Sequence, residues 1–153
     1  MANTYTQLNI QCIFAVKGRE NIISNSFRDD LHKYIYGILK KDNVFPLSIG
    51  GWLDHVHVFF ELNPNMNISD IVRMVKASSS KWINDNNFVK GKFNWQAGYG
   101  AFSYSRSQRD DVIKYIMTQE EHHKNKTFKD EYLELLRKFE IDYEVRYLFE
   151  FYD

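Results

Sequence analysis

Two histidines one residue apart, His55 and His57, lie within the largely apolar run of residues 52–61. An extended strand projects residues i and i+2 from the same face, so this pattern predicts both imidazoles on one side of a strand. Two neutral imidazoles side by side can bind a metal ion. Such a pair needs a further ligand and a reacting group, and the chain offers both later on, in Gln119 and Tyr115.

Tyr115 and Gln119 are four residues apart, which places them on one face of a predicted helix. A tyrosine hydroxyl can attack phosphorus, but its free pKa of about 10 makes it a weak nucleophile that needs a nearby cation. A divalent ion held by His55 and His57, with the Gln119 carbonyl oxygen as third ligand, would polarise a phosphodiester. Mixed nitrogen and oxygen ligands suit Mg or Mn. The predicted product is a phosphotyrosine linkage, which keeps the bond energy for rejoining.

The elements that must position these residues follow from hydrophobic periodicity and turn signals. Alternating residues predict strands over 5–16, 99–105 and two more within 44–62, separated at Gly50–Gly51. Apolar residues at three- and four-residue spacing predict helices over 23–41 and 69–84, and capping signals predict two more, over about 108–123 and 128–140. This order predicts an α+β fold with a mostly antiparallel sheet and helices packed on one face.

Three of the helix starts carry capping signals. They are Asn67 or Ser69 for the second helix, Ser107 with Asp110 for the third, and Thr127 with Asp130 for the fourth. The last stretch, residues 143–152, is aromatic and β-prone, and is expected to pack over the body or onto a partner chain.

Composition favours one domain with a solid core. The chain has 153 residues, of which 44% are hydrophobic and 16% aromatic. Its single cysteine, Cys12, excludes a disulfide framework within one chain and favours a reduced, cytoplasmic setting. The sequence shows no secretory signal and no apolar run long enough to span a membrane. We therefore expect one domain over residues 1–153, with an acidic aromatic tail at about 141–153.

The net charge is zero, but it is unevenly distributed. Residues 130–153 hold eight acidic and three basic residues, so the preceding body is mildly basic. Local cations could therefore bind phosphates. The candidate DNA-binding residues are Arg73, Lys76, Lys81 and Arg106, and Trp95, Tyr99 and Phe102 are candidates for stacking on unpaired bases.

His-hydrophobic-His on a strand, followed by Tyr-x-x-x-Gln on a helix, resembles the single-tyrosine HUH transposases of small bacterial insertion sequences. Three further segments resemble family segments and occur in the family order: residues 54–57, 76–83 and 93–103. The resemblance runs from about residue 5 to residue 140. His-x-His alone is a weak signal, whereas the ordered combination is specific.

The resemblance implies a ferredoxin-like (RRM-like) fold, a homodimer and cleavage of single-stranded DNA at imperfect hairpins near the element ends. It implies a 5′-phosphotyrosine link, a free 3′-hydroxyl and strand transfer without a nucleotide cofactor. By position, Tyr115 is the nucleophile, and His55, His57 and Gln119 are the metal ligands. Whether the site is shared between subunits stays open.

Two other functions use parts of the same pattern. One is a non-catalytic single-stranded nucleic-acid-binding module of this sheet type, which would tolerate Tyr115→Phe. The other is a related nicking enzyme, such as a domesticated HUH nickase acting on repeated palindromes. His122 and His123 lie one turn beyond Gln119. They could reach the metal or the DNA, or could simply be exposed residues at the helix end.

Overall fold

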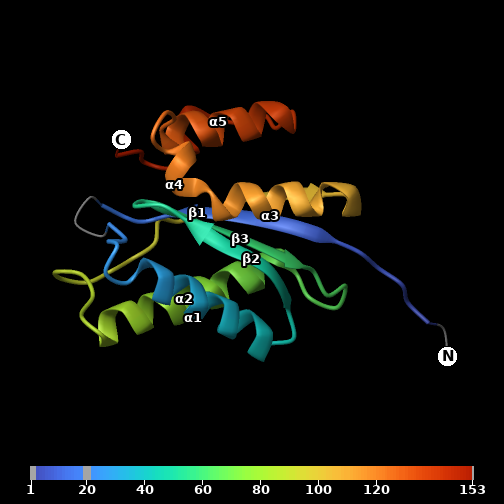
Figure 1. Cartoon of the computed structure of the whole chain (residues 1–153), viewed down its shortest axis with the longest axis horizontal. Coiled ribbons are helices and arrows are strands. Elements are labelled where there is room, and N and C mark those ends of the chain that lie inside the picture. Colours follow the sequence, from blue (N-terminus) through green and yellow to red (C-terminus); the bar gives the residue numbers. More distant parts are fainter. Residues whose placement is uncertain (1–2, 19–21, 153) are drawn as a thin grey trace.

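The computed structural model describes residues 3–18 and 22–152, and a four-stranded antiparallel sheet forms its centre (Figure 1). The strands are β1 (Asn9–Ala15), β2 (Phe45–Gly51), β3 (His55–Glu61) and β4 (Gly100–Tyr104), in the spatial order β2-β3-β1-β4. The helices are α1 (Arg28–Lys41), α2 (Ile68–Asp85), α3 (Arg109–Met117), α4 (Gln119–His122) and α5 (Phe128–Lys138). Two short 3-10 helices, η2 (Arg106–Gln108) and η3 (Val145–Tyr147), complete the order.

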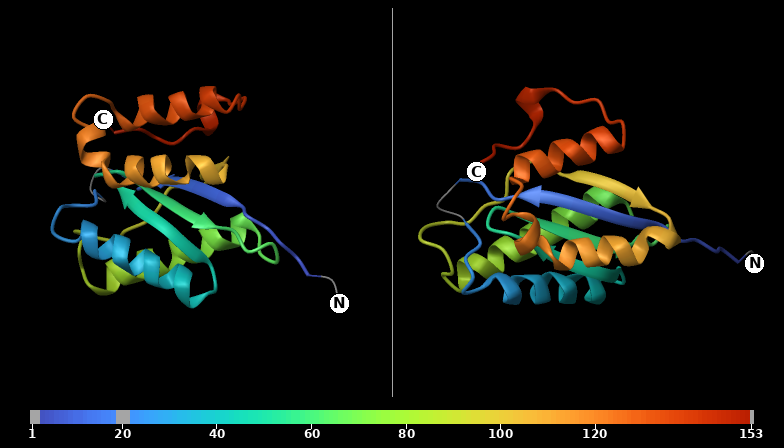
Figure 2. Two further views of the ribbon diagram at one scale, coloured as in Figure 1. Left: turned by 45° about the vertical axis from the view of Figure 1, so that its right-hand side comes forward. Right: turned by 45° about the horizontal axis from the view of Figure 1, so that its top comes forward.

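The predicted α+β class and antiparallel sheet are confirmed, and the strand order is that of a ferredoxin-like fold. Helices α1 and α2 cover one face of the sheet, as predicted. Helices α3, α4 and α5 cover the opposite face, which the prediction of helices on one face did not include (Figures 1 and 2).

The reason for this second helical layer lies in β3, which is buried on both faces. Val58 and Phe60 join the core formed with α1 and α2. Phe59 points the other way and packs against Val112 and Ile116 of α3. Burial of such a side chain is favourable by roughly 1.5–3 kcal/mol. Both faces of β3 must therefore be covered, and the helix that carries Tyr115 covers one of them.

Several helix and strand boundaries in the structure differ from the predicted ones. Gly50 and Gly51 lie inside β2 rather than between the two strands. The helix predicted over 108–123 is interrupted at Thr118, which separates α3 from α4. The capping box there belongs to Ser105 and Gln108, not to Ser107 and Asp110, because η2 forms the first turn.

The other two caps are confirmed. The side chains of Asn67 and Thr127 accept hydrogen bonds from the backbone N–H groups of Asp70 and Asp130.

Residues 143–152 form no strand in the described part of the chain, and contain only η3 and an extended segment that packs over the body. Within residues 3–18 and 22–152, no helix combines the length and apolarity needed to cross a bilayer.

Candidate metal and nucleophile site

Strand β3 brings His55 and His57 side by side, and both side chains are completely buried. Their ring centroids lie 5.0 Å apart, and both imidazoles lie on the face covered by α3 to α5. The i, i+2 spacing on a strand therefore acts as predicted.

Each imidazole is fixed by an outer hydrogen bond at Nδ1. His55 Nδ1 lies 2.7 Å from Oδ1 of Asp54, and His57 Nδ1 lies 2.7 Å from Oε1 of Gln11. Because an ionised carboxylate and an amide oxygen only accept, Nδ1 carries the hydrogen in both rings. The lone pair of each neutral imidazole is then on Nε2, the arrangement typical of metal-binding histidines.

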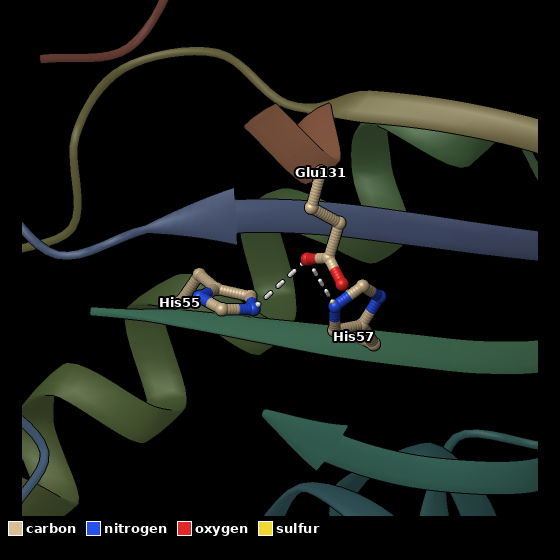
Figure 3. A group of neighbouring side chains, drawn as sticks. All are labelled: His55, His57 and Glu131. Carbon is tan, nitrogen blue, oxygen red and sulfur yellow. Dashed lines mark hydrogen bonds and ion pairs between the residues drawn. The ribbon is translucent and has the colours of Figure 1, made fainter. Parts of the chain in front are cut away.

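Both Nε2 atoms point to the same carboxylate, that of Glu131 on α5 (Figure 3). Glu131 Oε1 lies 3.3 Å from His55 Nε2 and 3.2 Å from His57 Nε2, and the side chain is only 2% exposed. Ligand atoms of the three residues all lie within 4.8 Å of one another. Lone pairs on nitrogen and oxygen that face one another in a buried space require positive charge between them, as protons or a metal ion. The donor set therefore fits a divalent cation.

The electrostatics of the three residues are coupled. Burial alone would lower the pKa of His55, but hydrogen bonds and charge from Asp54 and Glu131 raise it to about 9. Burial lowers the pKa of His57. Although burial favours the neutral acid, the neighbouring histidines hold the pKa of Glu131 well below its ordinary value. The carboxylate thus stays ionised beside at least one protonated imidazole when no metal is bound.

The second oxygen of Glu131 binds the predicted nucleophile. Tyr115, on α3, donates its hydroxyl hydrogen bond to Glu131 Oε2, and its ring lies 6.0 Å from that of His57 between centroids. Burial and the Glu131 carboxylate hold the pKa of Tyr115 well above its ordinary value. One carboxylate therefore links the tyrosine to the two histidines.

Gln119, at the start of α4, also lies in this group. Its Oε1 is 3.0 Å from His55 Nε2, and its Nε2 donates to Glu131 Oε2 at 3.2 Å. The four residues predicted for metal binding and attack are therefore neighbours in space.

Sequence reasoning missed Glu131. The available signal was an acidic residue on the buried stripe of an amphipathic helix, three residues after Phe128 and one before Tyr132. A carboxylate at such a position is rarely buried without a partner. Only the tertiary structure shows that the partners are the histidines of β3.

The predicted DNA-binding residues lie apart from this group. Arg73 and Lys81 are exposed on α2, where they pair with Asp70 and Asp85. Helix α2 covers the face of the sheet opposite to the histidines (Figure 1).

Lys76, also on α2, donates to the carbonyl oxygens of Gln96 and Gly98, and Arg106 is exposed in η2, next to α3. Of the predicted stacking residues, Trp95 and Phe102 are buried in the core, whereas Tyr99 is 37% exposed. Of the four predicted DNA-binding cations, Arg106 is the one that lies in the 3-10 helix directly before α3, the helix that carries Tyr115.

Comparison with known proteins defines the class. Residues 4–119 match the family described as "Transposase IS200 like". Since this match covers most of the chain, the protein belongs to the IS200-like transposase family, which confirms the resemblance found in the sequence. The ISDra2 transposase TnpA of Deinococcus radiodurans is 25% identical over an alignment of 122 residues, which covers 74% of this chain and 84% of that protein.

Two solved structures share the fold. A crystal structure of a candidate transposase from Deinococcus radiodurans aligns with a TM-score of 0.62 at 21% identity, covering 78% of this chain and 95% of the other. The structure of a REP-associated tyrosine transposase bound to a REP hairpin aligns with a TM-score of 0.58 at 12% identity, covering 80% and 73%. Glu131 lies beyond the family-matched residues.

Proposed function

We propose that this protein is a metal-dependent HUH transposase that cleaves and rejoins single-stranded DNA at hairpin-marked ends through a 5′-phosphotyrosine intermediate. The observation that carries the proposal is the shared carboxylate of Glu131. Its Oε1 faces Nε2 of His55 and His57, and its Oε2 accepts the hydrogen bond of the Tyr115 hydroxyl. One oxygen of Glu131 thus faces the two candidate metal-binding histidines, and the other binds the candidate nucleophile.

Tyr115 is the nucleophile of this proposal. Its hydroxyl oxygen forms a bond to phosphorus while the bond from phosphorus to the 3′-oxygen breaks, and the phosphate stays on the 5′ end. The tyrosine hydroxyl releases its proton and the leaving 3′-oxygen takes one up, so the products are a 5′-phosphotyrosine and a free 3′-hydroxyl. When bound by His55, His57 and Glu131, with Gln119 adjacent, a Mg or Mn ion would supply charge that polarises a phosphodiester oxygen. Before attack, Glu131 orients the tyrosine hydroxyl. No nucleotide cofactor is needed, because the phosphotyrosine bond retains the energy for rejoining.

A cavity of about 330 Å³ opens beside the nucleophile, between α3 and α5. Tyr115 and Glu131 form part of its wall, together with Tyr104 and Gln108. A cavity of this size holds a small ligand or one nucleotide unit, not a double helix. The size of the cavity therefore supports the proposal that an unpaired DNA strand, rather than a duplex, reaches Tyr115.

The REP hairpin in the related solved structure supports hairpin DNA as the partner. We extend the proposal to a single HUH domain over residues 1–153, to a homodimer and to phosphate contacts by Arg73, Lys76, Lys81 and Arg106. Tyr115 already lies beside the histidines of its own chain, so the proposed chemistry does not need a partner's tyrosine. Sedimentation would test the homodimer.

Replacement of Tyr115 by phenylalanine tests the chemistry. The protein is incubated with single-stranded oligonucleotides from both flanks of its own gene, with Mn or with EDTA, and run on a denaturing gel. We expect a metal-dependent covalent adduct that Tyr115→Phe abolishes, because the attacking oxygen is gone, while hairpin binding is retained. The control is Tyr36→Phe, at an exposed tyrosine of α1.

An adduct that persists in Tyr115→Phe would remove Tyr115 from the mechanism. Hairpin binding without any adduct in the unmodified protein would favour the alternative, a binding module without chemistry. An adduct formed equally well in EDTA would refute the metal dependence.

A further inference from the structure

We propose that His123 is a third imidazole ligand of the metal site, so that the site selects a transition-metal ion such as Mn(II), Co(II) or Zn(II) over Mg(II). This inference rests on the metal site of the proposed function. His123 follows α4 directly and lies outside the family-matched residues 4–119.

The position of His123 brings its ring into the buried group. The side chain is 3% exposed, and its ring centroid lies 4.8 Å from that of His55. Its Nε2 atom lies 3.0 Å from Oε1 of Gln119 and 3.5 Å from Oε1 of Glu131. Glu131 Oε1 is therefore within 3.5 Å of three imidazole nitrogens, one from each of the three histidines.

The outer hydrogen bond of His123 repeats that of the other two histidines. Its Nδ1 lies 2.8 Å from the backbone carbonyl oxygen of Lys126, which only accepts, so Nδ1 carries the hydrogen. The lone pair of the neutral ring is again on Nε2 and points inward. An imidazole that served packing alone would not need to direct an acceptor nitrogen at the oxygens of Gln119 and Glu131.

The adjacent histidine shows the contrast. His122 stacks on the Tyr115 ring at 4.4 Å between centroids, and its Nε2 lies 3.0 Å from the Thr118 hydroxyl. Its described contacts are to the tyrosine and the helix, with none to Glu131. The two neighbours therefore form a matched pair, one turned toward the site and one toward the nucleophile.

Three imidazoles and a carboxylate change the class of ion that the site prefers. Magnesium favours oxygen ligands and keeps several waters, whereas imidazole nitrogen suits later first-row ions such as cobalt and zinc, and manganese binds such sites more weakly than these. The Gln119 oxygen adds one neutral donor beside this set. The expected preference is thus for a transition-metal ion in the presence of excess magnesium.

The test is direct metal binding by the stripped full-length protein near neutral pH. Calorimetry with Mn(II) and visible absorption with Co(II) are compared for the unmodified protein, His123→Ala and His122→Ala, with unfolding transitions recorded for each. We expect His123→Ala to weaken binding by about 10- to 100-fold and to change the Co(II) spectrum, and His122→Ala to bind like the unmodified protein. An excess of Mg(II) should not displace Co(II).

Proton NMR of the unmodified Co(II) protein gives a second readout that does not depend on the folding of a variant. Each bound imidazole keeps its Nδ1–H, so three exchangeable, paramagnetically shifted signals are expected. Two such signals, or an unchanged affinity in His123→Ala, would overturn the inference while leaving the His55 and His57 site intact. A failure of the unmodified protein to bind Co(II) or Mn(II) would instead overturn the proposed function as well.

Discussion

At the scale of single residues, Asp54 helps to keep a proton on His55 when no metal is bound. Its carboxylate oxygen lies 2.7 Å from Nδ1 of His55, and with Glu131 it raises the pKa of that histidine to about 9. An unfolded chain would have a histidine pKa of about 6.5. The folded protein thus binds this proton more tightly, which contributes stability below about pH 6.5 that is lost as the pH rises through about 9. His57, with its lowered pKa, opposes this effect on the acidic side.

We predict that Asp54→Asn flattens the fall in stability of the metal-free protein over this alkaline range. The shift of His55 corresponds to about 3 kcal/mol at most, and removal of one of its two anionic partners should abolish a large part of it. The measurement is the free energy of unfolding by denaturant, in EDTA, at several pH values between about 6.5 and 9. Asp142→Asn, at an exposed carboxylate after α5, is the control.

An unchanged pH profile in Asp54→Asn would mean that Asp54 does not hold the proton on His55. A profile flattened equally by Asp142→Asn would point to general charge effects instead.

The residues found from sequence share a local signal. His55 with His57, and Tyr115 with Gln119, are pairs whose spacing fits a strand and a helix, so each pair could be placed on one face. Glu131 belongs to a different helix, and its role follows from the packing of α5 over β3. No spacing rule within a single element could have shown this contact.

At the scale of elements, the approach of α3 to β2 fixes the height of Tyr115 over the sheet. Gly50 makes this approach possible, since a Cβ atom there would lie 2.5 Å from the backbone oxygen of Ile116, next to Tyr115. The sequence showed two glycines and suggested a break between strands. The packing role of Gly50 could not be predicted from the sequence, because Ile116, the residue that a Cβ atom at Gly50 would meet, is more than sixty residues away in the chain.

We predict that Gly50→Ala destabilises the protein by about 1–3 kcal/mol, because a backbone oxygen cannot move away as a flexible side chain can. Displacement of α3 should also reduce formation of the covalent DNA adduct. Gly37→Ala, on helix α1, is the control, because apart from the local backbone of its own helix a Cβ atom there would have no neighbour within 4 Å. That change should stabilise the protein by up to about 1 kcal/mol. Equal effects of the two substitutions on unfolding would contradict the packing role of Gly50.

At the scale of the whole molecule, the part of the chain after residue 119 packs over the sheet face that carries His55 and His57. Phe128, the first residue of α5, stacks on His55 with 4.0 Å between ring centroids. The chain then returns after α5, and Phe149 packs against Tyr132 at 5.0 Å. Glu150 and the side chain of Gln96 exchange two hydrogen bonds of 2.8 Å. The C-terminal segment thus fastens α5, and with it Glu131, over the sheet.

We predict that Phe149→Ala loosens this attachment. The side chain is 8% exposed, and its loss should cost about 3 kcal/mol of unfolding free energy and speed hydrogen exchange in α5 more than in α1. Because Glu131 is on α5, the affinity for Mn(II) should fall as well. Tyr147→Ala, at a residue 74% exposed on the same segment, should change stability by no more than about 0.5 kcal/mol. If Phe149→Ala left hydrogen exchange in α5 and the affinity for Mn(II) unchanged, the C-terminal segment would not be needed to keep α5 and Glu131 in position.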